Sequence, residues 1–215
     1  MTRSRRIQGI DISHWEGDID FRRVKQAGIR FVYIKASEGA SYIDPDFERN
    51  YTEARKQRLK IGFYHYVTAR TVDEARVQAR HFAEVIRGKK YHGCPVMDFE
   101  TFGSLTKERI NEISLAFLQE LREVTGKRVA IYSDANNAKN TFDARLSVYP
   151  LWIAQYGVAS PDMNNHWRSW AGWQYTDDGR VYGIRGDVDR DYFSEDMLVS
   201  RDAVLNDRDA EENCV

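Results

Sequence analysis

The first two thirds of the chain alternate between short apolar runs and longer segments whose apolar residues recur three and four positions apart. Short apolar runs are typical of buried strands, and the second pattern is typical of amphipathic helices. Strands are predicted over residues 7–13, 31–36, 61–66, 94–100 and 128–132. A helix is predicted after each strand: over 18–27, from Asp44-Pro45 with Pro45 as its first residue, from the capping box Thr71–Glu74, over 110–126, and after Asp134.

The last third of the chain has a different pattern. Residues 151–156, 171–175 and 187–189 are predicted strands, and the gaps 157–170 and 176–186 contain Gly or Pro without a helical stripe. Five strand–helix units followed by three strands predict an α/β fold, an irregular TIM-like (β/α) barrel with little helix in its last third. The predicted barrel domain covers residues 7–195, between a flexible segment 1–6 and an acidic tail 196–215.

Composition narrows the range of functions. The chain has 215 residues, 42% of them hydrophobic, and a net charge of -1, so neither nucleic acid nor a membrane surface is an expected partner. The basic segment 1–6 is not followed by an apolar stretch, and we expect no signal peptide and no membrane span. The two cysteines, Cys94 and Cys214, are not expected to pair, and their spacing indicates no metal site.

The acids Asp98 and Glu100 are the strongest candidates for chemistry. Because side chains alternate along a strand, these two carboxylates share one face, with Cα atoms about 6.5–7 Å apart. Two acids this close cannot ionise independently, so one pKa is raised and the other is held low. The pair then supplies a proton donor and a lasting anion, as cleavage of a glycosidic bond requires.

Other candidates also lie at or near predicted strand ends. In a closed barrel these ends meet at one mouth, so we expect Asp11 and Asp189 to lie near the central pair. Tyr64, Tyr132 and Trp152 are expected at the same rim. Trp152, Trp173 and Tyr175 can be either core residues or sugar platforms. Lys35 either pairs with an acid of this cluster or extends to solvent.

Several motifs resemble those of the family 25 glycoside hydrolases, the Chalaropsis-type lysozymes. In chain order they are Gly9-Ile10-Asp11-Ile12-Ser13-His14-Trp15, Ile34-Lys35-Ala36-Ser37-Glu38-Gly39, Gly62-Phe63-Tyr64-His65-Tyr66, Asp98-Phe99-Glu100, Leu151-Trp152-Ile153-Ala154-Gln155-Tyr156, Trp173-Gln174-Tyr175 and Val188-Asp189. The similarity extends from about residue 7 to residue 193. It implies an irregular barrel that hydrolyses the β-1,4 bond after N-acetylmuramic acid in peptidoglycan.

The resemblance also implies roles for individual residues. Glu100 would be the general acid/base and Asp98 its electrostatic partner, while Asp11 and Asp189 would complete the acidic cluster. The candidate substrate-binding residues are Tyr64, Tyr132, Trp152, Gln174 and Lys35. In one position the chain departs from the family pattern, because Asp191 stands where an Asn is usual; this carboxylate either alters the pH profile or points to solvent.

We expect a monomer that needs no cofactor or metal, acts on the glycan strands of the cell wall, and cleaves with retention and with help from the substrate's acetamido group. Three alternatives remain open. A barrel that binds wall glycan without cutting it is disfavoured, since both Asp98 and Glu100 are present. A divalent cation held by the four acids is the second, and a chitinase-like enzyme is the third.

Overall fold

The computed structural model describes residues 6–199, which form a closed barrel. Within this range, eight strands pair in the order β1-β9-β8-β7-β6-β5-β4-β2, and pairing of β1 with β2 closes the ring. The barrel strands are β1 (Ile7–Ile12), β2 (Phe31–Glu38), β4 (Lys60–Tyr66), β5 (Val96–Asp98), β6 (Ala130–Asp134), β7 (Leu151–Ala154), β8 (Gly172–Gly179) and β9 (Val188–Phe193). A short strand, β3 (Tyr42–Ile43), pairs with the end of β2. The predicted α/β barrel is confirmed.

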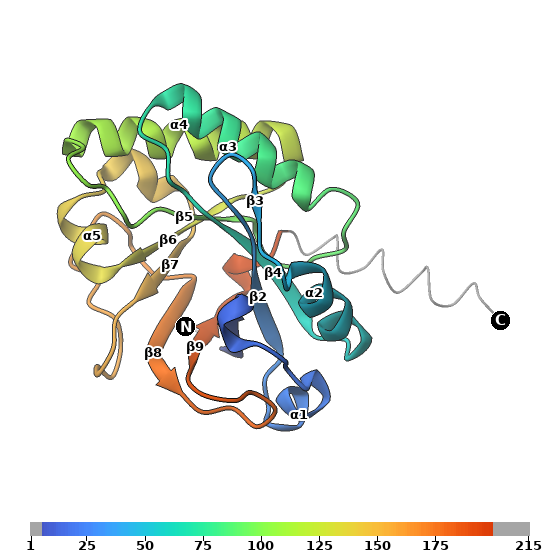
Figure 1. Ribbon diagram of the computed structural model, residues 1–215. Helices are drawn as coiled ribbons and strands as arrows, with labels where there is room; N and C mark the ends of the chain where they lie inside the picture. The colour runs from blue at the N-terminus through green and yellow to red at the C-terminus, as the bar shows by residue number, and fades with distance from the viewer. Residues whose placement is uncertain (1–5, 200–215) are drawn as a thin grey trace.

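Helices follow each of the first five barrel strands. They are α1 (Phe21–Gln26), α2 (Phe47–Lys56), α3 (Val72–Val85), α4 (Lys107–Thr125) and α5 (Ala135–Asn140), with 3-10 turns η1 (His14–Glu16), η2 (Ala144–Val148) and η3 (Glu195–Met197). The long helices α3 and α4 lie side by side across one flank of the barrel (Figure 1). None of the described helices is long and apolar enough to cross a membrane.

The predicted helix starts are right at two positions and wrong at another. The Thr71 side chain accepts a hydrogen bond from Glu74 N, and the Asp134 side chain accepts one from Asn137 N, so both residues are N-caps. Pro45 is not the first residue of α2. That helix begins at Phe47, because the buried Asp44 side chain accepts a hydrogen bond from Asp46 N and holds the chain in a turn before the helix.

The last strand was predicted with the wrong limits. Residue 189 was expected near the end of a strand, but β9 begins at Val188 and runs antiparallel to both β8 and β1. The reason is that β8 and β9 are joined by a hairpin without a helix, so the chain reverses direction. The start of β9 therefore lies at the same rim as the ends of the parallel strands, and Asp189 is the register partner of Asp11.

Aromatic side chains fill the interior of the barrel. The inner cluster consists of Phe31, Tyr33, Cys94, Val96, Ala130, Trp152, Ala171, Phe193 and Met197, with Tyr64 and Tyr132 packed against it. Gly62 makes room for this packing, since a Cβ at that position would collide with the Tyr33 ring. This packing fills the interior, and the polar side chains of Asp11, Asp98 and Gln174 lie above it at one end.

The packed chain continues beyond the predicted domain boundary at residue 195. Met197 is fully buried, its carbonyl accepts a hydrogen bond of 2.7 Å from Cys94 N, and Val199 N donates to His92 O. These residues close the end of the barrel opposite the acids. The predicted flexible segment and acidic tail otherwise fall largely on residues 1–5 and 200–215, outside the described residues, as does Cys214.

Candidate active site

Asp98 and Glu100 occupy the end of β5. Asp98 is its last residue and is 7% exposed, whereas Glu100 lies just past the strand and is exposed. Their carboxyl groups share a hydrogen bond, and the buried Oδ1 atom of Asp98 has no partner among the described residues. The pair thus combines a buried acid with one that reaches the mouth.

The pKa of each member of the pair is raised. Burial is the main cause of the large rise in the pKa of Asp98; the neighbouring Glu100 raises it further, and Lys35 opposes the rise. Burial also raises the pKa of Glu100, but its hydrogen bond with Asp98 works in the other direction. The two shifts therefore favour a proton on Asp98 over one on Glu100 in the ligand-free protein.

A second group of acids faces this pair. Asp11 lies in β1, is 7% exposed and accepts a hydrogen bond of 2.8 Å from Gln174 Nε2. Burial, followed by the charges of Asp189 and Asp191, raises its pKa well above the usual range. Burial is also the main cause that raises the pKa of Asp189 to about 7. The carboxyls of Asp189 and Asp191 each share a hydrogen bond with Asp11, so this group of acids holds protons near neutral pH.

Asp191 does not point to solvent. Its side chain is fully buried, its Oδ1 accepts a hydrogen bond of 2.8 Å from Trp152 Nε1, and its Oδ2 has no hydrogen-bond partner within residues 6–199. Burial raises the pKa of Asp191 well above the usual range, and the charge of Asp189 adds to the rise. The departure from the family pattern thus places an extra titratable group beneath the site.

Tyr64 and Tyr132 lie between the two groups of acids. Burial raises the pKa of Tyr64, and the charges of Asp11 and Asp98 add to the rise, which places its hydroxyl near both groups. Tyr132 donates a hydrogen bond of 2.8 Å to Gln174 Oε1, and Gln174 in turn donates to Asp11. This network joins β6, β8 and β1 across the mouth.

Trp152 and Lys35 take different positions from the other candidates. Trp152 is 2% exposed and lies below Tyr64 and Tyr132, with ring centroids 6.5 and 5.0 Å away, so it is part of the inner cluster. Lys35 follows neither alternative, because it pairs with an acid outside the predicted cluster. Its Nζ lies 2.8 Å from Glu38 Oε2, and its side chain is 12% exposed.

Trp173 and Tyr175 face away from the mouth. Trp173 is 4% exposed, lies outside the inner cluster, and donates a hydrogen bond to Gln155 O. Tyr175 stacks on Tyr192, with centroids 4.8 Å apart. Both are packing residues.

Sequence reasoning missed two residues of the site. Tyr156 donates a hydrogen bond of 2.6 Å to Gln174 Oε1, the same acceptor that Tyr132 uses. Glu16 accepts a hydrogen bond of 2.6 Å from Ser13 N and lies close enough to raise the pKa of both Asp11 and Asp189. The signal for Glu16 was present, because Ser13-x-x-Glu16 is a capping box.

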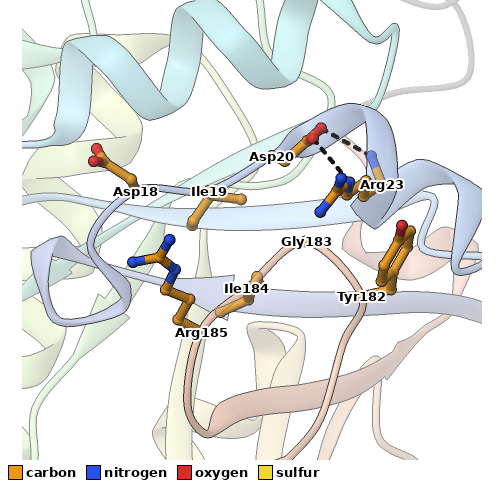
Figure 2. A pocket seen from close by; sticks show the side chains of 8 residues that line it. All are labelled: Asp18, Ile19, Asp20, Arg23, Tyr182, Gly183, Ile184 and Arg185. Carbon is orange, nitrogen blue, oxygen red and sulfur yellow. Dashed lines mark hydrogen bonds and ion pairs between the residues drawn. The ribbon is translucent and has the colours of Figure 1, made fainter.

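A pocket of 540 Å³ lies elsewhere, between the segment before α1 and the loop that joins β8 to β9 (Figure 2). Its charged groups partly pair with one another, since Asp20 lies 3.3 Å from Arg23 Nε and Arg23 lies over the Tyr182 ring. None of the candidate acids lines it. Among residues 6–199, no group of three His, Cys, Asp or Glu side chains is arranged to hold a metal ion.

A strand-end pair of carboxyls sharing one proton, at the mouth of a closed β/α barrel, is an arrangement suited to glycoside hydrolases. The sequence profile of Glycosyl hydrolases family 25 matches residues 10–184. The chain belongs to this family.

Individual relatives agree with that membership. The chain is 36% identical to the autolytic lysozyme of Clostridium acetobutylicum over 200 residues, which cover 93% of this chain and 60% of the relative. It is 28% identical to the N,O-diacetylmuramidase of a Chalaropsis species, over 85% of this chain and 96% of the relative. The crystal structure of the bacterial lysozyme from Streptomyces coelicolor superimposes with a TM-score of 0.75 and 31% identity, covering 90% of this chain and 93% of that one.

Proposed function

We propose that this protein is a lysozyme that hydrolyses the β-1,4 bond between N-acetylmuramic acid and N-acetylglucosamine in bacterial peptidoglycan. The observation that carries the proposal is the Asp98–Glu100 pair, one acid buried and one exposed, at the mouth of the barrel. Relatives named lysozyme and N,O-diacetylmuramidase support this choice of substrate. The bacterial cell wall is then the place of action, and a monomer is sufficient, because one chain supplies the whole site.

Glu100 is the proton donor in this proposal. Of the pair, it is the member that a glycosidic oxygen can approach, because Asp98 is buried. The shared proton must therefore move from Asp98 to Glu100 when substrate binds. A substrate amide N–H that donates to Asp98 stabilises the Asp98 anion and so favours this transfer.

The acetamido group of N-acetylmuramic acid supplies that N–H and also a nucleophile. Its carbonyl oxygen attacks the anomeric carbon as Glu100 protonates the leaving oxygen, so the C–O bond breaks and a cyclic oxazolinium ion forms. Asp98, now an anion, orients the amide and stabilises the positive charge, and Tyr64 holds the acetyl group. Glu100 then removes a proton from water, which opens the ring with net retention.

Asp11, Asp189, Gln174 and Tyr132 bind and orient the sugar on the opposite side of the mouth in this proposal. The hydrogen bonds from Tyr132 to Gln174 and from Gln174 to Asp11 support it, since they fix these groups before the substrate arrives. Trp152 supports the tyrosines from below, and Lys35 acts electrostatically on Asp98.

The decisive experiment is mass analysis of the products formed from purified peptidoglycan. New reducing ends on N-acetylmuramic acid are expected. Reducing ends on N-acetylglucosamine, or faster cleavage of chitin than of peptidoglycan, would contradict the proposal and favour the chitinase alternative. Activity that disappears with a chelator and returns with Mg²⁺ or Ca²⁺ would instead favour a metal-dependent reaction.

The stereochemical course has its own test. Proton NMR of the first product released should show the β anomer, and a thiazoline mimic of the cyclic intermediate should inhibit. An initial α anomer would end the substrate-assisted scheme while leaving the choice of substrate unaffected.

A further inference from the structure

Trp15 is the most exposed large apolar side chain among the described residues, with 81% of its surface accessible. It is the middle residue of η1, directly after β1. Leaving an indole in water forgoes the stabilisation that burial would bring. An indole this exposed is a candidate for contact with a ligand.

The turn that carries the indole is held in place by hydrogen bonds, and a neighbouring ring lies against the indole. Its backbone turn is closed by a hydrogen bond of 2.6 Å from Ser13 N to Glu16 and one of 3.2 Å from Trp15 N to Ser13 Oγ. The neighbouring ring is fixed as well, because His14 Nδ1 lies 2.8 Å from Oδ2 of Asp44, whose side chain is fully buried. The His14 and Trp15 ring centroids are 4.5 Å apart.

This surface lies at the edge of the mouth. Glu16, the next residue, is close enough to raise the pKa of Asp11, Asp189 and Tyr64. The strand β3 lies directly before Asp44 in the chain, and its residues Tyr42 and Ile43 are 42% and 49% exposed. The Tyr42 ring lies 6.0 Å from Lys35 Nζ, and Lys35 in turn acts on Asp98. Trp15 thus belongs to a rim that borders both groups of acids.

We propose that Trp15 binds the apolar face of an N-acetylhexosamine ring of the glycan strand, outside the bond that is cut. This inference rests on the proposed function. An aromatic ring and the C–H face of a pyranose are matched in size and exclude water from each other. The neighbouring acid Glu16 favours a ring without negative charge on that face.

Kinetics of Trp15→Ala on long peptidoglycan strands test the proposal. We expect KM to rise about 10-fold, equivalent to about 1.4 kcal/mol of binding, with kcat within about twofold of wild type, because Trp15 does not touch the reacting atoms. Trp15→Phe should restore most of the affinity. Val148→Ala removes an exposed apolar side chain from η2, which precedes the start of β7 at the opposite end of the barrel, and should change neither value.

Binding gives a second readout. In Glu100→Gln, a soluble peptidoglycan fragment should shift the tryptophan emission to shorter wavelength, and adding Trp15→Phe should remove most of that shift. An unchanged KM and a retained shift would overturn the role of Trp15. If wild-type protein leaves peptidoglycan uncut, it is the proposed function that fails, so the two failures are distinguishable.

Discussion

The carboxyl groups at the mouth differ in how much water reaches them, and the roles proposed for them rest on this difference. Asp98 and Asp11 are each 7% exposed, Asp191 is fully buried, and Glu100 is exposed. Burial penalises the charged form, so the buried acids retain protons while the exposed acid exchanges them with solvent and ligand. This difference supports the proposal that Glu100 is the proton donor.

Replacing Glu100 by Gln should lower kcat about 10²–10⁴-fold, because the amide keeps the shape but cannot donate the proton. The circular dichroism spectrum and Tm should stay close to those of wild type, since the side chain is exposed. Glu53→Gln makes the same change on the surface of α2 and should leave kcat unaltered. Retention of more than about a tenth of the wild-type rate would contradict the assignment.

Asp191→Asn should stabilise the protein, and more so as the pH rises from about 4 to 7. An unfolded Asp loses its proton near pH 4, whereas burial raises the pKa of Asp191 well above that value in the folded protein. Over this range the unfolded state therefore releases a proton that the folded state keeps, and wild-type stability falls by up to about 1.4 kcal/mol per pH unit. An amide avoids this penalty and can still accept from Trp152 and donate to Asp11.

The measurement is the Tm of both proteins across this pH range. Asp73→Asn removes an exposed carboxylate from the first turn of α3 and should show no comparable pH-dependent difference. If the Tm difference between Asp191→Asn and wild type becomes smaller as the pH rises, this account is wrong.

At the scale of elements, the two ends of the barrel differ in the side chains that they carry. The ends of the parallel strands and the start of β9 carry the acids, whereas η3 closes the opposite end with a buried Met197. Residues at the first end are expected to affect catalysis, and residues at the other to affect stability.

Met197→Ala should destabilise the protein by about 2–5 kcal/mol, because it removes a fully buried side chain that packs against the inner cluster. Urea unfolding gives this value, and kcat measured where the variant is folded should be close to that of wild type. Asp196→Ala changes an exposed residue of the same turn and should cost less than about 0.5 kcal/mol. A loss of kcat without a loss of stability would show that this end is not purely structural.

At the scale of the whole molecule, the barrel encloses a thiol that reports on its opening. Cys94 is fully buried in the inner cluster, and burial raises the pKa of its thiol to about 12. A thiol that is both protonated and inaccessible reacts slowly. Its reactivity should therefore follow the opening of the barrel.

In a Cys214→Ser variant, Cys94 should react with a thiol reagent only as the protein unfolds. The reaction rate, followed against urea concentration, should rise together with the loss of circular dichroism. The double variant with Met197→Ala should react faster at low urea, because η3 covers this end of the barrel. Rapid labelling of Cys94 in the native protein would contradict the closed barrel.

Local features were predictable because they depend on neighbours in the sequence. The strand–helix alternation, the caps Thr71 and Asp134, and the placing of Asp98 and Glu100 at one strand end all follow from periodicity and from short-range hydrogen bonds. The motifs around Asp11 and Gln174 likewise indicated the family.

Other features required contacts between segments far apart in the chain. Asp189 lies beside Asp11 because β9 pairs antiparallel with β1. Asp191 is buried because its side chain points toward Trp152, which donates a hydrogen bond to it. The sequence alone determined which acids are present and on which strands. Only the tertiary structure decided which of them water reaches, and therefore which carry protons, because a pKa depends on burial and on neighbouring charges contributed by the whole barrel.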